Sequence, residues 1–95
     1  MEPRLARLLQ VVTEEYIETA EPVGSQHLVD LYDLGVSSAT VRNWCAELEA
    51  SGHLMQPHTS GGRIPTEEGF RSYVSLFVSP KPASKRDREV LDRAW

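Results

Sequence analysis

The chain has 95 residues, of which 40% are hydrophobic and 25% charged. This length allows one small domain with a modest core and excludes a two-lobed enzyme. The apolar fraction is too high for a disordered chain, and six glycines and six prolines are too few for a low-complexity segment. Cys45 is the single cysteine, which excludes an internal disulfide, and the sequence has no apolar run long enough for a membrane span. We therefore expect a soluble, intracellular chain.

The charge is distributed unevenly along the chain. The net charge is -4, and the first 35 residues hold two arginines against seven acidic residues. The last 16 residues hold five basic and three acidic residues. A net negative charge by itself disfavours a nucleic-acid partner. Because most of the acidic residues lie in the first third, the middle of the chain can still present a locally basic surface.

Two helices are predicted in the first third of the chain. Residues 3–19 repeat apolar side chains at helical spacing, and Pro3 suits the first turn. The segment 21–24 ends this helix, and Ser25 is the expected cap of a shorter helix reaching residue 32. The side chains expected to face inward are Leu5, Leu8, Leu9, Val12 and Tyr16 from the first helix and Leu28 and Leu31 from the second.

A third helix is predicted from the cap at Ser37 to about residue 50, where Ser51 and Gly52 end it. Val36 before the cap and Val41 four residues after it are placed to form a hydrophobic staple. Its inward face combines apolar side chains, and its outward face is small or polar. The inward set is Val41, Trp44, Cys45 and Leu48, and the outward set is Ala39, Arg42, Asn43, Ala46 and Ala50.

A β-hairpin and a fourth helix follow. Residues 54–56 and 63–65 are expected to be extended, and the polar, glycine-containing segment 57–62 joins them. Thr66 is the expected cap of the fourth helix, with Glu67 and Glu68 near its positive end. The apolar stripe of that helix is Phe70, Tyr73, Val74 and Phe77.

Residues 79–95 are expected to form a linker and the start of a further helix. Proline-rich residues 79–83 suit a stiff linker, and Ser84 with Asp87 is a capping pattern. Because this helix would end on the apolar Trp95, we expect the chain to be a fragment of a longer protein. Its basic residues are expected to form a solvated face, and an auxiliary contact with a DNA backbone is the alternative.

The order of elements over residues 1–78 predicts a mainly α domain with a small β-hairpin, the winged helix-turn-helix. In this fold the third helix enters a DNA major groove and the hairpin, or wing, contacts the backbone or the minor groove. The outward alanines allow close approach to base edges. Arg42 can pair with guanine and Asn43 with adenine.

Further DNA contacts are expected at the helix start and in the hairpin. Ser37, Ser38 and Thr40 offer hydroxyl and N–H groups to a phosphate. Arg63 is expected to place a long cation on the flexible hairpin tip. The complete set of expected DNA-binding residues is Ser37, Ser38, Ala39, Thr40, Arg42, Asn43, His58, Thr59, Ser60 and Arg63.

Three segments resemble a known family: Glu-Pro-Val-Gly-Ser at 21–25, Leu-Gly-Val-Ser-Ser-Ala-Thr-Val-Arg-Asn at 34–43, and Gln-Pro-His-Thr-Ser-Gly-Gly-Arg-Ile-Pro-Thr at 56–66. Together they resemble the N-terminal domain of HrcA, the bacterial heat-inducible transcription repressor family. The resemblance covers about residues 4–78. It implies a repressor of chaperone (heat-shock) genes that binds an inverted-repeat operator in double-stranded DNA. It also implies a cytoplasmic location at the bacterial nucleoid. The full-length protein is implied to be a homodimer kept active by the GroE chaperonin, whereas this fragment alone is expected to be a monomer.

Two other functional classes are compatible with a small helical domain. A winged helix can serve as a protein interaction module without sequence-specific DNA binding, since a fold does not dictate function. An enzyme is not expected, because the acidic residues Glu14, Glu15, Glu18 and Glu21 line one helix face without a nucleophile or metal partner. No cofactor or metal is expected, because the three histidines lack metal-ligand spacing with one another or with Cys45.

Overall fold

The computed structural model describes residues 1–57 and 62–78. This part of the chain contains helices α1 (Pro3–Thr19), α2 (Ser25–Leu31), α3 (Ser38–Ala50) and α4 (Glu67–Tyr73), strands β1 (Leu54–Met55) and β2 (Ile64–Pro65), and a π-helical segment η1 (Val74–Val78). The predictions for His58, Thr59 and Ser60, and for the linker and helix in 79–95, lie outside the described residues. No described helix has the length and apolarity needed to span a membrane.

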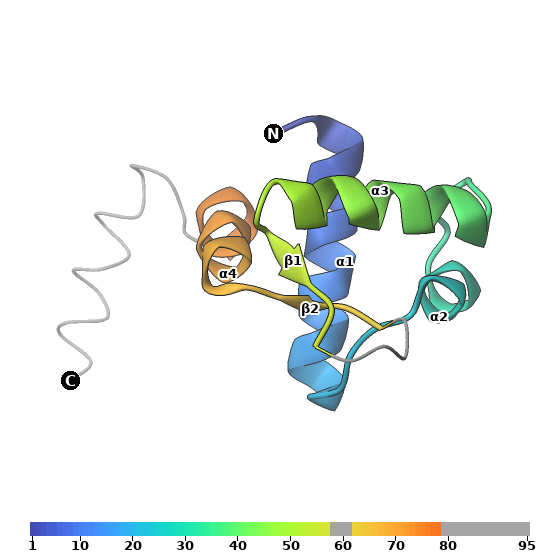
Figure 1. The fold of residues 1–95 in the computed structure, drawn as a ribbon, viewed down its shortest axis with the longest axis horizontal. Coiled ribbons are helices and arrows are strands. Elements are labelled where there is room, and N and C mark those ends of the chain that lie inside the picture. The colour runs from blue at the N-terminus through green and yellow to red at the C-terminus, as the bar shows by residue number, and fades with distance from the viewer. Residues whose placement is uncertain (58–61, 79–95) are drawn as a thin grey trace, which may run out of the picture.

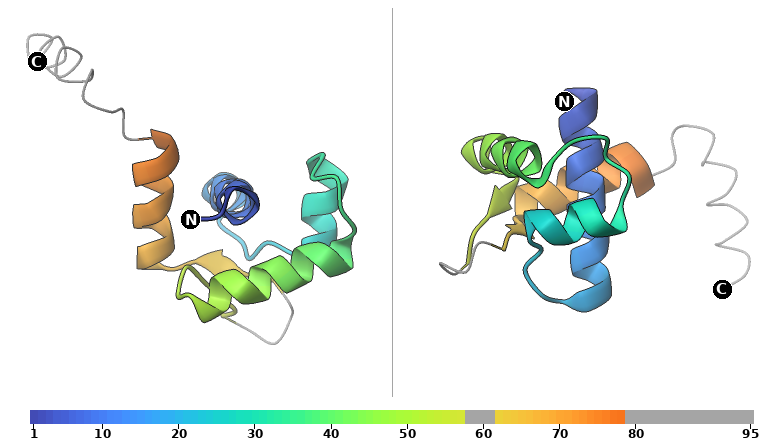
Figure 2. Two further views of the ribbon diagram at one scale, coloured as in Figure 1. Left: turned by 90° about the horizontal axis from the view of Figure 1, so that it is seen from above. Right: turned by 90° about the vertical axis from the view of Figure 1, so that its right-hand side faces the viewer.

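Helix α1 is the centre of the fold, as the end-on view in Figure 2 shows. It contacts α3, α4 and β2, while α2 packs on α3. In Figure 1, α3 crosses α1, with α2 and α4 at opposite ends of the molecule. Seen from above, α3 and the two strands lie on the same side of α1. The core consists of buried side chains from these elements: Leu8, Leu9, Val11, Val12, Val23, Leu28, Val41, Cys45, Leu48 and Leu54.

The bounds predicted for α3 are confirmed, and so is its cap. The Ser37 hydroxyl accepts a hydrogen bond from the Thr40 amide at 3.3 Å, which satisfies one of the donors that a helix start leaves unpaired. Val36 packs against the core that contains Val41, as a hydrophobic staple requires. The helix ends at Ala50, next to the predicted stop.

Helix α2 differs from the prediction in two details. Gly24 occupies the N-cap position, and Ser25 is the first helical residue, with its side chain buried. Leu31 was predicted to face inward, but it is 56% exposed. The helix ends at Leu31 and the backbone becomes extended at Tyr32, so Tyr32 and Leu34 pack against the core in its place.

The predicted hairpin is confirmed as an antiparallel pair with Leu54 opposite Pro65 and Met55 opposite Ile64. A third segment joins it that the sequence did not indicate. The Val23 amide donates to the Arg63 carbonyl at 2.8 Å, and the Arg63 amide donates to the Val23 carbonyl at 3.0 Å. The wing is therefore attached by its base to the connection between α1 and α2.

Thr66 caps α4 as predicted, since its hydroxyl accepts from the Gly69 amide at 3.0 Å. Tyr73 is buried, but Val74 and Phe77 are 43% and 40% exposed, so their predicted place in the buried stripe is wrong. The helix becomes π-helical after Tyr73. A π-helix turns by a smaller angle per residue, so the spacing that placed Phe77 in the stripe no longer applies.

Candidate nucleic-acid interface

The two predicted faces of α3 are observed. Val41, Cys45 and Leu48 on the inner face are 0–1% exposed. The residues on the opposite face are exposed, namely Ala39, Arg42, Asn43, Ala46 and Ala50. Because the inner face alone packs into the core, the outer face presents a cation, an amide and small side chains without disturbing the fold. The side chains expected to read bases therefore lie on an accessible helix surface.

Trp44 lies at the edge between these faces and is only partly buried. The guanidinium of Arg4 stacks over its ring at 5.2 Å from the ring centre, an arrangement that attracts a cation to the aromatic face. Arg4 also pairs with Glu2 and with Glu47. These carboxylates raise the pKa of the Arg4 guanidinium, mainly through its hydrogen bond with Glu2. The start of α1 is thereby attached to the side of α3.

The hydroxyl groups at the start of α3 are not equally available. The Ser37 hydroxyl donates to the Thr40 hydroxyl at 3.2 Å and also accepts from the Thr40 amide. Both side chains are thus engaged in the cap. Ser38 instead lines a hollow of about 370 Å³ between α2, α3 and the wing. Of the three expected phosphate ligands at the helix start, Ser38 borders this hollow and the other two do not.

The hollow brings together residues from three elements. It is lined by Gly24, Ser25, Gln26, Ser38, Arg42, Gln56, Gly62 and Arg63. Two arginines that are distant in sequence, Arg42 on α3 and Arg63 at the base of the wing, therefore border the same depression. The positive charge of Arg42 and the nearby hydroxyl and amide groups suit an anionic ligand such as a phosphate backbone.

Arg63 does not lie as the sequence suggested. Its backbone pairs with Val23 at the base of the wing, and its side chain is 11% exposed and turned onto α3. There its Nε donates to Oε1 of Glu49 at 2.8 Å. A cation extended from a flexible tip was expected, and the structure shows instead an ion pair between the wing and α3.

Two exposed amide side chains, Gln26 and Gln56, border the hollow but were missed by the sequence reasoning. Gln26 lies in α2, the helix before α3, and its side-chain amide donates to Asp30 at 2.9 Å. Its place on the polar side of α2, in the helix that leads into the turn, was the available signal. Gln56 carried no such signal, because its position follows from the pairing of β1 with β2.

The acidic residues of α1 serve structural contacts. Glu15 accepts from Tyr32 at 3.3 Å and lies 2.8 Å from Nε2 of His27, which links α1 to α2. Glu14 accepts from the Tyr73 hydroxyl at 3.0 Å, which links α1 to α4. Burial raises the pKa of both tyrosines, and the glutamates raise it further.

Cys45 lies on the inner face of α3, and its side chain is buried in the core. Burial raises the pKa of its thiol to about 11, against a smaller lowering effect of the nearby Arg63 charge. A thiol that stays protonated at neutral pH is a poor nucleophile. Within residues 1–57 and 62–78, no group of three or more His, Cys, Asp or Glu side chains could hold a metal ion.

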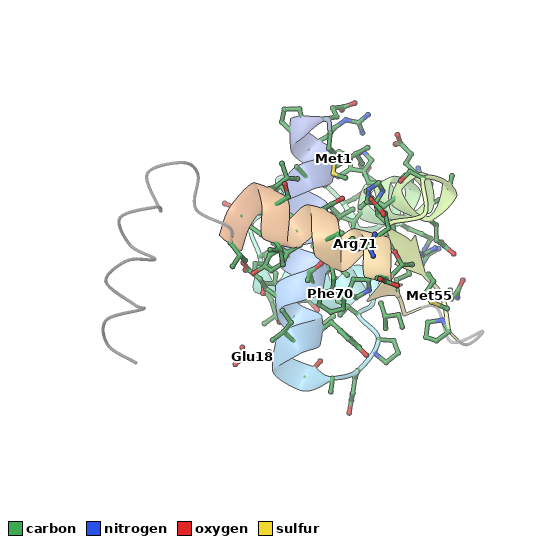
Figure 3. The ribbon with its side chains drawn as sticks, turned by 90° about the vertical axis from the view of Figure 1, so that its left-hand side faces the viewer. Met1, Glu18, Met55, Phe70 and Arg71 are labelled. Carbon is green, nitrogen blue, oxygen red and sulfur yellow. The ribbon has the colours of Figure 1, made fainter. Side chains whose placement is uncertain are left out.

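A second hollow, of about 660 Å³, lies on the α4 side of the molecule. It is bounded by the start of α1, the end of α3 and the outer face of α4, and Met1 and Arg71 are among its lining residues. Figure 3, which views the molecule from the α4 side, shows Met1 at the start of the chain and Arg71 on α4. Arg71 pairs with Glu67 at 2.7 Å, so the charge at this hollow is partly neutralised.

Comparison with known proteins finds relatives among the transcription repressors. No family model matches the chain. It is 49% identical over 88 residues to the heat-inducible transcription repressor HrcA of Mycobacteroides abscessus and 48% identical over 90 residues to HrcA of Mycolicibacterium gilvum. These matches cover 93% and 95% of the chain but 26% of each relative, so the chain spans about a quarter of their length.

A solved structure is also similar. A crystal structure described as a hypothetical protein at 2.2 Å resolution superposes with a TM-score of 0.76 at 43% identity, over 79% of this chain and 23% of the other. The element order, the exposed face of α3 and the attached hairpin agree with the winged helix-turn-helix expected from the sequence. Along nearly its whole length, the chain is thus a relative of the N-terminal part of the HrcA heat-inducible transcription repressors and belongs to that family.

Proposed function

We propose that the chain is the sequence-specific DNA-binding domain of a transcriptional repressor of heat-shock genes. The observation that carries the proposal is the outer face of α3, where an exposed arginine and asparagine lie among small side chains beside the wing. Occupancy of an inverted-repeat operator near a promoter would block transcription sterically. The repressor names of the relatives support this function.

In this proposal the outer face of α3 enters the major groove. Arg42 pairs with guanine and Asn43 with adenine, since their planar groups match two atoms on those base edges. Ala39 allows the helix backbone to approach the bases closely. These contacts give sequence preference, whereas contacts to phosphates give affinity and register.

The phosphate contacts are assigned to the helix start and the wing. Ser38 borders the hollow beside Arg42, and Ser37 and Thr40 extend the polar surface at the start of α3. Thr59, Ser60 and His58 belong to the proposed wing contact by their sequence alone, since they lie outside the described residues. Arg63 lies at the base of the wing, where its side chain pairs with Glu49, so its part in DNA binding is to place the wing.

The remaining partners belong to the longer protein. The relatives are about four times the length of this chain, judged by the 26% that it covers. A homodimer that places two recognition helices on an inverted repeat, and the GroE chaperonin as regulator of chaperone operons, are proposed for the full-length repressor. The chain alone is proposed to be a monomer with weak operator affinity, because one domain occupies one half-site. A stable dimer in sedimentation equilibrium at micromolar concentration would contradict this.

Fluorescence anisotropy tests the proposal with a duplex carrying the family's inverted repeat and a scrambled duplex of equal composition, each at two salt concentrations. We expect the repeat to bind more tightly, with a log–log salt slope of roughly -0.9 for each phosphate neutralised. Arg42→Ala should remove the preference for the repeat. The matched control is Arg71→Ala, which removes the same charge from the α4 side and should keep the preference.

The α4 side carries one feature that favours a second function. Leu76 and Phe77 are 49% and 40% exposed, and Leu76 borders the larger hollow. Exposed apolar side chains beside a hollow are typical of a protein contact. If neither duplex binds at either salt concentration, a protein interaction module replaces the DNA-binding function.

A further inference from the structure

Besides the buried Leu54 of β1 and Pro65 of β2, three polar or close contacts attach the wing to the rest of the molecule. The first is the pair of backbone hydrogen bonds between Val23 and Arg63, at 2.8 and 3.0 Å. The second is the close approach of Gly62 to Pro22, where an added Cβ would lie 2.7 Å from the proline Cβ. Both of these points hold the wing on the connection between α1 and α2. Neither of them joins the wing to α3.

The third point is the ion pair between Arg63 and Glu49, which joins the wing directly to α3. Its Nε to Oε1 distance is 2.8 Å, and the exposures of the two side chains are 11% and 31%. A hydrogen bond between charged groups is shorter and stronger than a neutral one, and it fixes orientation. Partial burial limits screening by solvent and salt. This contact therefore adds a directional side-chain restraint between the wing and α3 to the packing of Leu54.

The geometry also argues against a phosphate contact through the same atoms. In the described part of the chain, the Nε of Arg63 is used by Glu49, and the guanidinium lies close enough to Cys45 to influence its thiol. If the whole guanidinium of Arg63 contacted a phosphate, its pair with Glu49 would break. The partly buried Glu49 carboxylate would then lie unpaired beside DNA. Breaking such a pair costs more than the pair itself contributes.

We propose that Arg63 is a positioning residue that sets the wing against the recognition helix through Glu49. This rests on the proposed DNA-binding function, in which α3 and the wing contact one duplex together. The ion pair determines the spacing between the two contacts. Glu49, an acidic residue near the proposed DNA surface, thereby favours binding although its charge alone would oppose it.

The first test compares Glu49→Ala with Glu47→Ala in the absence of DNA. Both variants remove one negative charge from the second half of α3, but Glu47 lies 3.6 Å from Arg4 of α1, on the side of the helix away from this ion pair. Amide hydrogen exchange is measured by NMR at Val23 and Arg63, with Leu9 and Val12 as core references. We expect protection of Val23 and Arg63 to fall about tenfold in Glu49→Ala. Glu47→Ala should match the wild type, and the core amides should not change in either variant.

A conservative variant separates positioning from general stability. Glu49→Gln keeps an oxygen that can accept from the Nε of Arg63 and removes only the charge. It should restore part of the wing protection that Glu49→Ala loses. Equal protection in Glu49→Ala and Glu47→Ala, or an equal loss at the wing and the core, would overturn the proposal. These results do not depend on DNA and stand apart from the fate of the proposed function.

The second test measures binding to the operator duplex. Glu49→Ala should bind about threefold or more weakly than Glu47→Ala, because a loosened wing must be ordered on binding. Arg63→Gln should weaken binding with an unchanged salt slope. Tighter binding by Glu49→Ala, or a slope reduced by about one phosphate in Arg63→Gln, would show that Arg63 contacts phosphate directly. If the wild type binds neither duplex, the proposed function fails, and the exchange data alone decide whether the pair positions the wing.

Discussion

The recognition helix and the wing are held in place by different interactions. Helix α3 is held by Val41, Cys45 and Leu48, which are almost completely buried. The wing buries only Leu54 and Pro65 at its base, and two backbone hydrogen bonds, a glycine contact and the pair of Arg63 with Glu49 hold it as well. Burial of apolar surface is strong and has little directional preference, whereas polar contacts are weaker and directional. Substitutions on the outer face of α3 should therefore leave its placement intact, but substitutions at the base of the wing should move the wing.

The two arginines of the candidate interface illustrate this difference. Arg42 is exposed on the outer face of α3. Arg63 is mostly buried against Glu49. Both arginines border the same hollow, yet their surroundings suit a base contact in one case and a positioning contact in the other. Residue type and approximate location do not by themselves assign a role.

The largest expected effect comes from breaking the support of α3. Leu48→Ala should lower the free energy of unfolding by about 3 kcal/mol, because it removes a fully buried side chain and leaves a cavity. Urea denaturation followed by circular dichroism measures this change. Leu31→Ala is the control, since Leu31 is 56% exposed, and it should cost less than about 0.5 kcal/mol. Similar losses in both variants would contradict the described core.

A smaller effect is expected when the outer face of α3 changes. Asn43→Ala should leave unfolding unchanged and reduce discrimination at one base pair by about 1–3 kcal/mol. Binding is measured with a series of duplexes that differ from the operator by one base pair each. Loss of discrimination should be confined to one position in each half-site. A uniform loss across all duplexes would assign Asn43 to a backbone contact.

Gly62→Ala should cost about 1 kcal/mol and act on the wing. The added Cβ would meet the Pro22 ring at 2.7 Å and its backbone carbonyl carbon at 3.1 Å, so the wing must shift away from the α1–α2 connection. Amide chemical shifts of Val23 and Arg63 should change while those of α3 stay constant. Gln56→Ala, at an exposed position after β1, is the control. Shifts spread through α3 would show that the two regions do not respond separately.

The smallest effect near neutral pH concerns Cys45. Burial raises the pKa of its thiol to about 11, which keeps the thiol protonated in the folded chain, so alkylation by iodoacetamide at pH 8 should proceed only through unfolding. Because the pKa is higher in the folded chain than in the unfolded one, the thiol stabilises the fold fully below its ordinary pKa of 9.0, and this contribution is lost as pH rises through about 11. Alkylation in the native state at the rate of a free thiol would contradict the burial.

Much of this arrangement could be predicted from the sequence because it depends on local patterns. The 3.6-residue period assigned the two faces of α3, and a serine followed by a helical pattern located its cap at Ser37. Leu31 was wrongly predicted to face inward. The helix ends at that residue, and helical periodicity does not show at which residue a helix loses contact with the core. The partner of Arg63 was missed because Glu49 is 14 residues away, and only the folding of the wing onto α3 brings them together.

NMR titration of the isotope-labelled chain with the operator duplex shows whether the outer face of α3 contacts DNA. We expect the amide signals of Ala39, Arg42, Asn43 and Ala46 to shift most, together with those of the wing, while signals of α4 change little. A titration in which the largest shifts fall on Arg71 and Leu76, or in which no signal moves, would contradict this expectation.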